Sequence, residues 1–250
     1  MRRVFHVAAQ AAYWRQRPED VIRAAVDGTR HVVDACLRAG VQRLVLTSSL
    51  AALGVPLGDE LLTEAHVFNL SPDRFPYGYA KRQAEIEAVQ RAGADLQVVI
   101  VNPSIVLGAG DVHQISGSLI VQAARGRTFL YTGGGTNIVH IDDVAAGHLA
   151  AAERGRHGER YILGGENLTH RELFTLLAEI VGGTRMVIEG VSTTKAAHTL
   201  AQMHGVEMPL THELYRVLFE DKPVSDVLPS LLARALRSEG EYPEIGRQRS

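Results

Sequence analysis

Val41-Gln42-Arg43-Leu44-Val45-Leu46-Thr47-Ser48-Ser49 is the stretch that decides the fold, and 28 residues after Ser49 the chain continues with Tyr77-Gly78-Tyr79-Ala80-Lys81. The apolar run at positions 44–46 predicts a buried strand over 41–47. Pro76 and Gly93 bound a predicted helix over 76–91. A buried strand that alternates with helices is typical of an α/β protein with a parallel sheet.

Tyr77 and Lys81 form the pair with the clearest chemistry. Residues four apart lie on one face of a helix, about one turn from each other. A lysine ammonium beside a phenol favours the phenolate and lowers the pKa of the tyrosine. The phenol can then donate or accept a proton at a carbinol oxygen. The chain has seven tyrosines and only three lysines (Lys81, Lys195 and Lys222), so a chance Tyr-x-x-x-Lys is expected roughly 0.08 times.

The remaining pattern extends the same architecture. Strands are predicted at 4–7, 96–101, 129–131 and 161–163, and helices at 18–39, 116–124, about 142–152 and 171–181. Residues 50–74 read as a long loop. Asp142 or Asp143 is the predicted N-cap of its helix, and Thr169 with Glu172 forms a predicted capping box. We therefore predict an α/β fold, a truncated doubly wound (Rossmann-like) parallel sheet with helices on both faces.

The C-terminal part has a different pattern. Helices at 194–205, 210–219 and 224–236 are predicted in succession with no strand between them. The sequence thus predicts a core over 1–185, a helical segment over 186–240 and a flexible tail over 241–250.

Composition limits the kind of partner. Charged residues make up 22% and the net charge is −2, so no bulk attraction to nucleic acid or to an anionic membrane is expected. No run of 18 apolar residues exists. The N-terminal apolar run is short and is interrupted by His6 and Gln10, which favours a cytoplasmic protein over a secreted one. The single cysteine, Cys36, lies on the apolar stripe of a predicted helix and is expected to be buried.

One motif is missing from the sequence. A dinucleotide-binding βαβ unit places G-x-G-x-x-G under the pyrophosphate. Gly108-Ala109-Gly110 and Gly133-Gly134-Gly135 both lack the third glycine at the required spacing.

Six segments in order resemble an extended short-chain dehydrogenase/reductase of the NAD-dependent epimerase, dehydratase and dihydroflavonol-reductase type, over about 4–182. They are Val4-Phe5-His6-Val7-Ala8-Ala9, Val26-Asp27-Gly28-Thr29, Leu46-Thr47-Ser48-Ser49 with Gly54, Tyr77 with Lys81, Asn102-Pro103-Ser104-Ile105-Val106 with Gly108, and Val139-His140-Ile141-Asp142-Asp143-Val144-Ala145.

The resemblance implies roles for these residues. Tyr77 would be the general acid/base, Lys81 would lower its pKa and bind the nicotinamide ribose, and Ser49 would hydrogen-bond the reacting oxygen. The implied cofactor is NAD or NADP. The residues implied to bind it are Ala8, Ala9, Thr47, Ser48, Tyr77, Lys81, Pro103, Ser104 and Ile105. The family also implies a homodimer formed through the long helix and the Tyr/Lys helix.

The sequence departs from that family in two places. Ala25 stands where the family's long helix usually begins with Asn. Two βα units, roughly 60 residues, are missing before residue 4, and with them the glycine loop and the ribose selector. Catalytic competence, the substrate and the choice between NAD and NADP therefore stay open.

A second resemblance covers about 187–240. Val187-Ile188-Glu189-Gly190-Val191-Ser192-Thr193-Thr194-Lys195, Gly205-Val206-Glu207-Met208-Pro209 and Tyr215-Arg216-Val217-Leu218-Phe219 resemble the C-terminal helical end of NAD(P)-dependent glycerol-3-phosphate dehydrogenase. In that family, the positions of Val187 and Glu189 touch the dinucleotide. The catalytic lysine region of that family has no counterpart here. The chain thus resembles a fusion, natural or artefactual, joined near 182–186.

Three functions follow as hypotheses. The first is an NAD(P)-dependent oxidoreductase or epimerase acting on a secondary alcohol or ketone, such as a nucleotide sugar or a flavonol-like carbinol. The second is a non-catalytic fusion remnant or partner subunit, and the third is glycerol-3-phosphate dehydrogenase activity. The eleven histidines show no HExxH or comparable ligand spacing, so no metal is expected.

Overall fold

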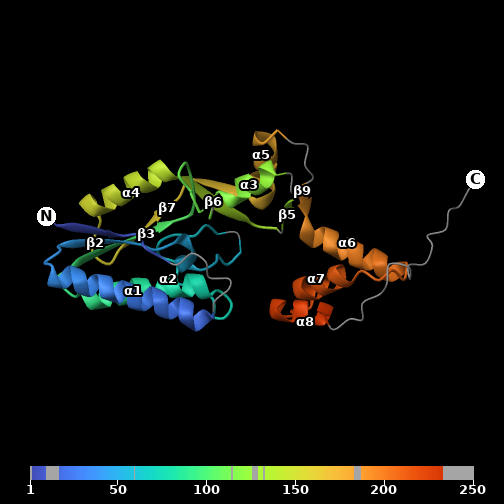
Figure 1. Cartoon of the computed structure of the whole chain (residues 1–250), viewed down its shortest axis with the longest axis horizontal. Coiled ribbons are helices and arrows are strands. Elements are labelled where there is room, and N and C mark those ends of the chain that lie inside the picture. The colour runs from blue at the N-terminus through green and yellow to red at the C-terminus, as the bar shows by residue number, and fades with distance from the viewer. Residues whose placement is uncertain are drawn as a thin grey trace, which may run out of the picture. The chain divides into compact units, whose positions relative to one another are not determined.

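The computed structural model describes residues 2–9, 17–58, 60–113, 115–125, 129–131, 133–182 and 187–232 (Figure 1). Within these ranges, the side chains at 129–131, 187–193, 228 and 231–232 are not described. The chain forms two compact units. Unit 1 is Met1–Arg127 with Gly134–Thr184, and unit 2 is Thr128–Gly133 with Arg185–Ser250.

The centre of unit 1 is a four-stranded parallel sheet. Its strands are β1 (Arg3–His6), β2 (Arg43–Thr47), β3 (Gln97–Pro103) and β7 (Arg160–Leu163), in the order β1-β2-β3-β7. The predicted parallel sheet is therefore confirmed. Strand β1 lies at the edge of this sheet and, among the described strands, pairs with β2 alone.

Helices cover both faces of this sheet, as predicted. Figure 1 shows α1 (Pro18–Arg38) and α2 (Pro76–Ala92) below it and α4 (Ile141–Arg154) above it. Both lower helices begin with Pro at their first turn, where the missing N–H has no intrahelical partner to lose. Between β2 and α2, the predicted loop contains a 3₁₀ helix, η1 (Leu50–Leu53).

The strand period of two divides the core between the two faces. Leu44 and Leu46 pack on the side of α1 and α2, whereas Val45 packs on the side of α4. Cys36 is buried in the first cluster, as predicted. The buried guanidinium of Arg43 donates hydrogen bonds to the carbonyls of Ala152 at 2.9 Å and Ala151 at 3.4 Å, which holds the last turn of α4 to the sheet.

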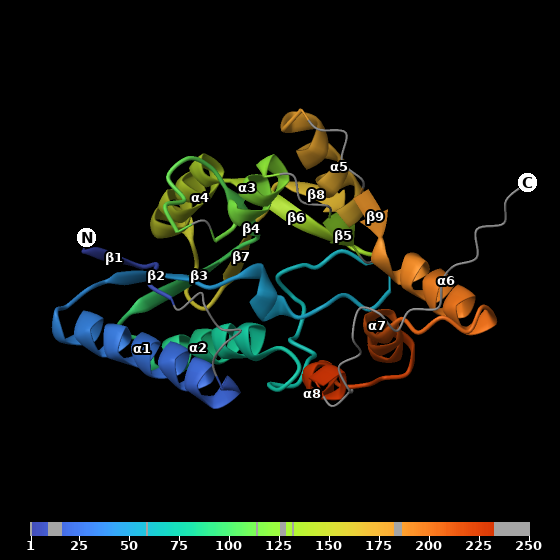
Figure 2. The same cartoon turned by 45° about the vertical axis from the view of Figure 1, so that its right-hand side comes forward.

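A smaller mixed sheet extends unit 1 (Figure 2). It contains β4 (Ile105–Leu107), β6 (Gly135–His140) and β8 (Glu166–Thr169) in the order β4-β6-β8, with β4 parallel and β8 antiparallel to β6. None of these three strands was predicted, since they are short and lack a clear alternation. Helices α3 (Ser118–Ala124) and α5 (His170–Ile180) accompany this sheet.

Helix caps were predicted with mixed success. The capping box of Thr169 and Glu172 is present at the start of α5. At α4 the prediction was wrong, because the N-cap is His140, whose Nδ1 accepts a hydrogen bond from the backbone N–H of Asp142. Asp142 and Asp143 lie inside the first turn instead, where the positive end of the helix dipole stabilises their negative charges.

Unit 2 contains one short strand pair and a run of helices. Strand β5 (Phe129–Tyr131) pairs in parallel with β9 (Val187–Glu189), and α6 (Gly190–Met203), α7 (Pro209–Phe219), the 3₁₀ helix η2 (Val224–Asp226) and α8 (Val227–Leu232) follow. Strand β9 was not predicted, and α6 begins earlier than expected because it follows directly on that strand. The end of the helix predicted over 224–236 and the whole tail over 241–250 lie outside the described residues.

Among the described helices, none combines the length and the apolar composition that crossing a membrane requires.

Candidate functional site

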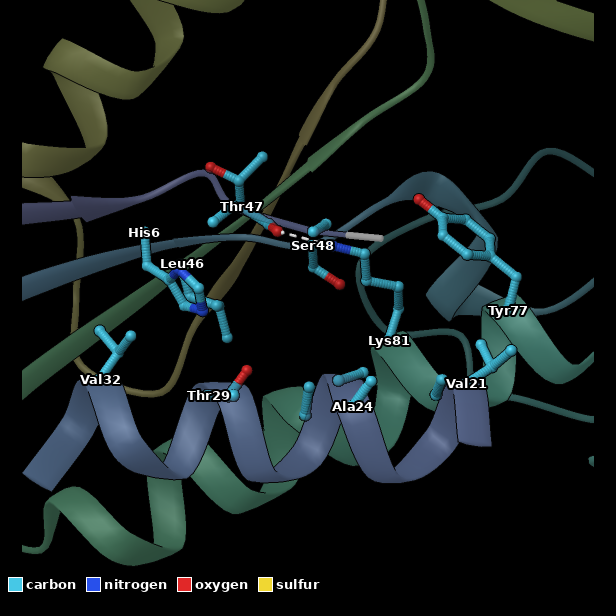
Figure 3. A pocket seen from close by; sticks show the side chains of 16 residues that line it. His6, Val21, Ala24, Thr29, Val32, Leu46, Thr47, Ser48, Tyr77 and Lys81 are labelled. Carbon is cyan, nitrogen blue, oxygen red and sulfur yellow. Dashed lines mark hydrogen bonds between the residues drawn. The ribbon is translucent and has the colours of Figure 1, made fainter. Parts of the chain in front are cut away.

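Unit 1 contains a cavity of about 530 Å³ between the sheet and its two lower helices. Four segments line it: the end of β1 with the residues after it, one face of α1, the end of β2, and the first half of α2 (Figure 3). A volume of this size is within the range of small-molecule and cofactor sites. The lining residues are His6, Ala8, Ala9, Val21, Ala24, Ala25, Gly28, Thr29, Val32, Leu46, Thr47, Ser48, Tyr77, Ala80, Lys81 and Ala84.

Tyr77 and Lys81 both line this cavity from α2. Figure 3 shows their side chains on the same side of the helix, directed toward the end of β2. The one-turn spacing of the two residues follows from the helix that Pro76 begins. The two residues of the sequence motif thus form part of the wall of one cavity.

Lys81 is a buried cation. It is only 9% exposed, and its Nζ donates a hydrogen bond to the backbone carbonyl of Thr47 at 3.2 Å. Burial lowers the pKa of Lys81, and the negative charge of Glu85 opposes that change. An ammonium has three donors, so Lys81 retains donors for a ligand in the cavity.

The two serines at the end of β2 have different surroundings. Ser48 lines the cavity, is 6% exposed, and its Oγ has no hydrogen-bond partner among the described residues. Ser49 does not line the cavity, and its Oγ accepts a hydrogen bond from the N–H of Ala51 as the N-cap of η1. A hydroxyl that accepts one bond still has its proton to donate.

The other implied cofactor residues divide into three groups. Ala8, Ala9 and Thr47 line the same cavity. Pro103, Ser104 and Ile105 lie where β3 passes into β4 and are not part of its wall; the Ser104 Oγ is buried with no hydrogen-bond partner in the described chain. Val187 and Glu189 belong to β9 in unit 2, and their side chains lie outside the described residues.

Two residues of the cavity wall, and one residue beside it, were not singled out from the sequence. His6 lines the cavity, and burial together with the charge of Lys81 lowers its pKa. Gly28 lines it from α1, and nothing lies within 4 Å of the position that a Cβ would take there. Glu85 is fully buried one turn after Lys81. In the sequence, each of the three is related to a motif residue only by helical or strand spacing. That spacing shows which residues share a face of a helix or strand, but not that the face borders a cavity.

The residues present fit the nicotinamide end of a dinucleotide. The wall offers an unpartnered buried hydroxyl at Ser48 and a buried ammonium at Lys81, both of which are donors for ribose or amide oxygens. Opposite them, Ala24, Ala25 and Gly28 give the cavity a small-residue floor on α1. The described residues contain no cluster of three or more His, Cys, Asp or Glu side chains suited to a metal ion.

Comparisons with known proteins identify the family of the N-terminal part. Residues 1–164 match the profile of the NAD dependent epimerase/dehydratase family. A dihydroflavonol 4-reductase-like protein of Synechocystis sp. is 36% identical over 184 residues, which cover 72% of this chain and 54% of that protein. The chain therefore spans little more than half the length of this relative.

Solved structures give the same fold. The crystal structure of gox2253 has a TM-score of 0.67 at 35% identity and covers 82% of this chain and 64% of its own. MoeE5 in complex with UDP-glucose and NAD has a TM-score of 0.61 at 28% identity, with coverages of 75% and 65%.

The C-terminal part has other relatives. Residues 149–229 match the profile of the NAD-dependent glycerol-3-phosphate dehydrogenase C-terminus. An NAD(P)+ glycerol-3-phosphate dehydrogenase of Leuconostoc mesenteroides is 54% identical over 63 residues, which cover 25% of this chain and 19% of that protein. The chain belongs to the NAD dependent epimerase/dehydratase family, and its C-terminal segment is similar to the C-terminal part of glycerol-3-phosphate dehydrogenase.

Proposed function

We propose that unit 1 binds the nicotinamide end of NAD(H) or NADP(H) in its cavity and supports redox chemistry at a secondary alcohol or ketone. The observation that carries this proposal is the placement of Tyr77 and Lys81 on one wall of the cavity, with the Lys81 ammonium buried. Family membership supports a nicotinamide cofactor in general. The substrate class we favour is a nucleotide sugar or a flavonol-like carbinol.

The nicotinamide, when bound, accepts or supplies a hydride. The residues of this chain handle the proton. In the oxidation direction, the Tyr77 phenolate accepts the proton of the substrate hydroxyl while the carbon–hydrogen bond of the same carbinol gives up its hydride. In the reduction direction, the Tyr77 phenol returns that proton to the new alkoxide oxygen. The nearby Lys81 cation favours the phenolate form.

The serines have the role of orienting the reacting oxygen. Ser49 lies just outside the cavity wall, and in this proposal its hydroxyl proton is donated to that oxygen, while Ser48, which has no partner among the described residues, donates to the cofactor. Ala8, Ala9, Thr47, Pro103, Ser104 and Ile105 complete the proposed cofactor contacts.

The first experiment is a fluorescence titration of the purified chain with NADH and with NADPH. Saturable binding is expected, and Lys81→Ala should weaken it by about tenfold or more because a charge-assisted hydrogen bond is lost. Lys195→Ala, which changes an exposed lysine of unit 2, is the matched control and should bind as the wild type does. Absence of binding up to millimolar cofactor would contradict the proposal.

A second experiment separates binding from chemistry. Tyr77→Phe should retain cofactor binding and lose turnover by a factor of about 10² to 10⁴, the usual contribution of general acid–base catalysis. The assay follows NADH absorbance across a panel of ketones, secondary alcohols and nucleotide sugars. Equal turnover by Tyr77→Phe and wild type would remove Tyr77 from the mechanism.

The similarity of residues 149–229 supports a second candidate, glycerol-3-phosphate dehydrogenase activity. Oxidation of NADH with dihydroxyacetone phosphate as substrate would establish it. If neither assay gives turnover and neither nucleotide binds, the chain acts as a non-catalytic partner subunit or is a fusion remnant.

We further propose a homodimer, formed as in the family through α1 and α2. Sedimentation velocity of the full chain is the test, and a single species at the monomer mass across a hundredfold concentration range would contradict it.

A further inference from the structure

Glu85 is a buried carboxylate for which the proposed chemistry has no use. It lies in α2, one turn after Lys81, and is 0% exposed. Its Oε1 accepts a hydrogen bond from Asn102 Nδ2 at 2.7 Å, and its Oε2 accepts one from the Arg82 guanidinium at 3.0 Å. Arg160 Nη1 lies 4.0 Å from the same oxygen.

Such a carboxylate is a costly way to stabilise a core. Removing a charge from water costs several kcal/mol, and apolar side chains of similar volume often give equal or greater stability. Glu85 is 0% exposed, and it lines a second pocket together with Arg82 and Arg160, so its charge is balanced by neighbouring guanidinium groups more than by water. Its presence calls for a role at the neighbouring site.

Asn102 carries the connection from Glu85 to the serine segment. This residue is also 0% exposed, and its Nδ2 uses both hydrogens: one for Glu85 and one for the backbone carbonyl of Ser49 at 2.9 Å. The same carbonyl accepts the N–H of Ala52 at 3.0 Å. A carboxylate–amide–carbonyl chain therefore joins α2 to the segment that carries Ser48 and Ser49.

The negative charge of Glu85 also acts on the Lys81 cation one helical turn away. Burial lowers the pKa of Lys81, and the Glu85 charge raises it again. The other titratable groups around the Lys81 side of the cavity are His6 from β1 and Tyr77 from α2, while α1 and the end of β2 contribute only apolar side chains, Gly28, Thr29, Thr47 and Ser48. Arg82 and Arg160 contact Glu85 and line a second pocket with it, separate from the cavity that Lys81 lines.

We propose that Glu85 is a positioning residue of this site: it holds the Asn102 amide against the Ser49 backbone, and it keeps a negative charge one turn from Lys81 so that Lys81 remains a cation facing the cavity. The inference deepens the proposed function and rests on it for its catalytic meaning. The contacts themselves exist without any cofactor, so they are testable in the free chain.

The first test follows the charge of Lys81 by NMR. The chain has three lysines, so lysine labelled with ¹³C at the ε-carbon gives few signals, and Lys81→Met identifies the one from Lys81. In Glu85→Gln, which keeps the shape and removes the charge, Lys81 should lose its proton at lower pH than in the wild type. Glu87→Gln is the matched control, because Glu87 is a carboxylate of the same helix that pairs with Arg30 instead; it should leave the Lys81 titration unchanged.

The second test follows the Ser49 segment by amide hydrogen exchange. The N–H groups of Ala51 and Ala52 bond the hydroxyl and the carbonyl of Ser49. Their exchange should accelerate at least about threefold in Glu85→Gln, since the segment opens locally more often. Glu85→Asp keeps the charge, and it should restore the Lys81 titration even where its shorter reach leaves the exchange fast.

The outcomes separate the two proposals. A Lys81 titration and exchange rates that match the wild type in a folded Glu85→Gln chain would overturn this inference, whatever the cofactor results. Altered titration with no NADH binding in the wild type would uphold the positioning contacts and overturn the proposed function. Where both hold, Glu85→Gln should lower kcat about tenfold or more, and it should weaken NADH binding less than Lys81→Ala does, because the lysine side chain stays in place. If Glu85→Gln does not fold, the charge role is tested with Glu85→Asp, which keeps the carboxylate, and Glu85→Leu, which removes it. A Lys81 titration in Glu85→Asp that matches the wild type supports the charge role. A Lys81 titration in Glu85→Asp that is shifted as far as in Glu85→Leu contradicts it.

Discussion

The Nζ of Lys81 donates a hydrogen bond to the backbone carbonyl of Thr47 over 3.2 Å, which joins helix α2 to the end of strand β2. The bond brings a charged side chain into a cavity whose other walls are largely apolar. It also places the ammonium beside Ser48 and on the same wall as Tyr77 (Figure 3).

Replacing Lys81 by methionine should not destabilise the chain. Because the pKa of Lys81 is lowered in the folded state, the fold disfavours its charged form, and an apolar side chain of similar length removes that cost. We expect an unchanged or higher Tm by scanning calorimetry, with about 2–4 °C for each kcal/mol gained. Cofactor binding should be lost in the same variant. A clear drop in Tm would mean that Lys81 serves the fold and not a ligand.

His6 should make the stability of unit 1 sensitive to mild acid. Its pKa is lowered by burial and by Lys81, so between that pKa and about 6.5 the unfolded chain binds more protons than the folded chain. The free energy of unfolding should therefore fall as the pH decreases below about 6.5. Urea unfolding at pH 7.5 and pH 5.0 should show a smaller loss in His6→Gln than in the wild type. His113→Gln, at an exposed position, should behave as the wild type does.

Two helical glycines should respond oppositely to alanine. At Gly28, nothing lies within 4 Å of an added Cβ, so Gly28→Ala should stabilise α1 by about 0.5–1 kcal/mol. At Gly78, the Cβ would lie 2.6 Å from the carbonyl of Ala51 and 2.7 Å from the Phe75 ring, so Gly78→Ala should cost about 1–3 kcal/mol. Chemical denaturation of the two variants measures both signs, and equal effects would contradict the placement of α1 beside an open cavity.

Lys222 should be required for the stability of unit 2. Its Nζ bonds the buried carboxylate of Glu213 and the Ser230 hydroxyl, and that bond lowers the pKa of Glu213. The Glu213 carboxylate thus contributes stability above its ordinary pKa, and the contribution is lost as the pH falls below that value. Lys222→Met should speed the amide exchange of α7 at pH 7. It should also make the stability of α7 less dependent on pH in the acid range. Lys195→Met, at an exposed site over the Phe219 ring, is the control.

The main strands and helices of unit 1 were predictable because their residues carry a local signal. The apolar run at Leu44 to Leu46, Pro at the start of α1 and α2, and the capping box at Thr169 and Glu172 all act within a few residues of themselves. Strands β4, β6, β8 and β9 were missed, since short strands are stabilised by pairing partners distant in sequence. The His140 cap was missed for a similar reason, because two aspartates stood closer to the usual pattern.

The sequence by itself determined the pairing of Tyr77 with Lys81, because a helix fixes the positions of residues four apart. Only the tertiary structure decided that Ser48, not Ser49, lines the cavity, since the chain turns into η1 directly after β2 and the Ser49 hydroxyl caps that helix. It likewise brought Glu85 and Asn102 together across 17 residues of sequence. A hydrogen bond of that kind depends on how a helix is seated on a sheet, which no local pattern encodes.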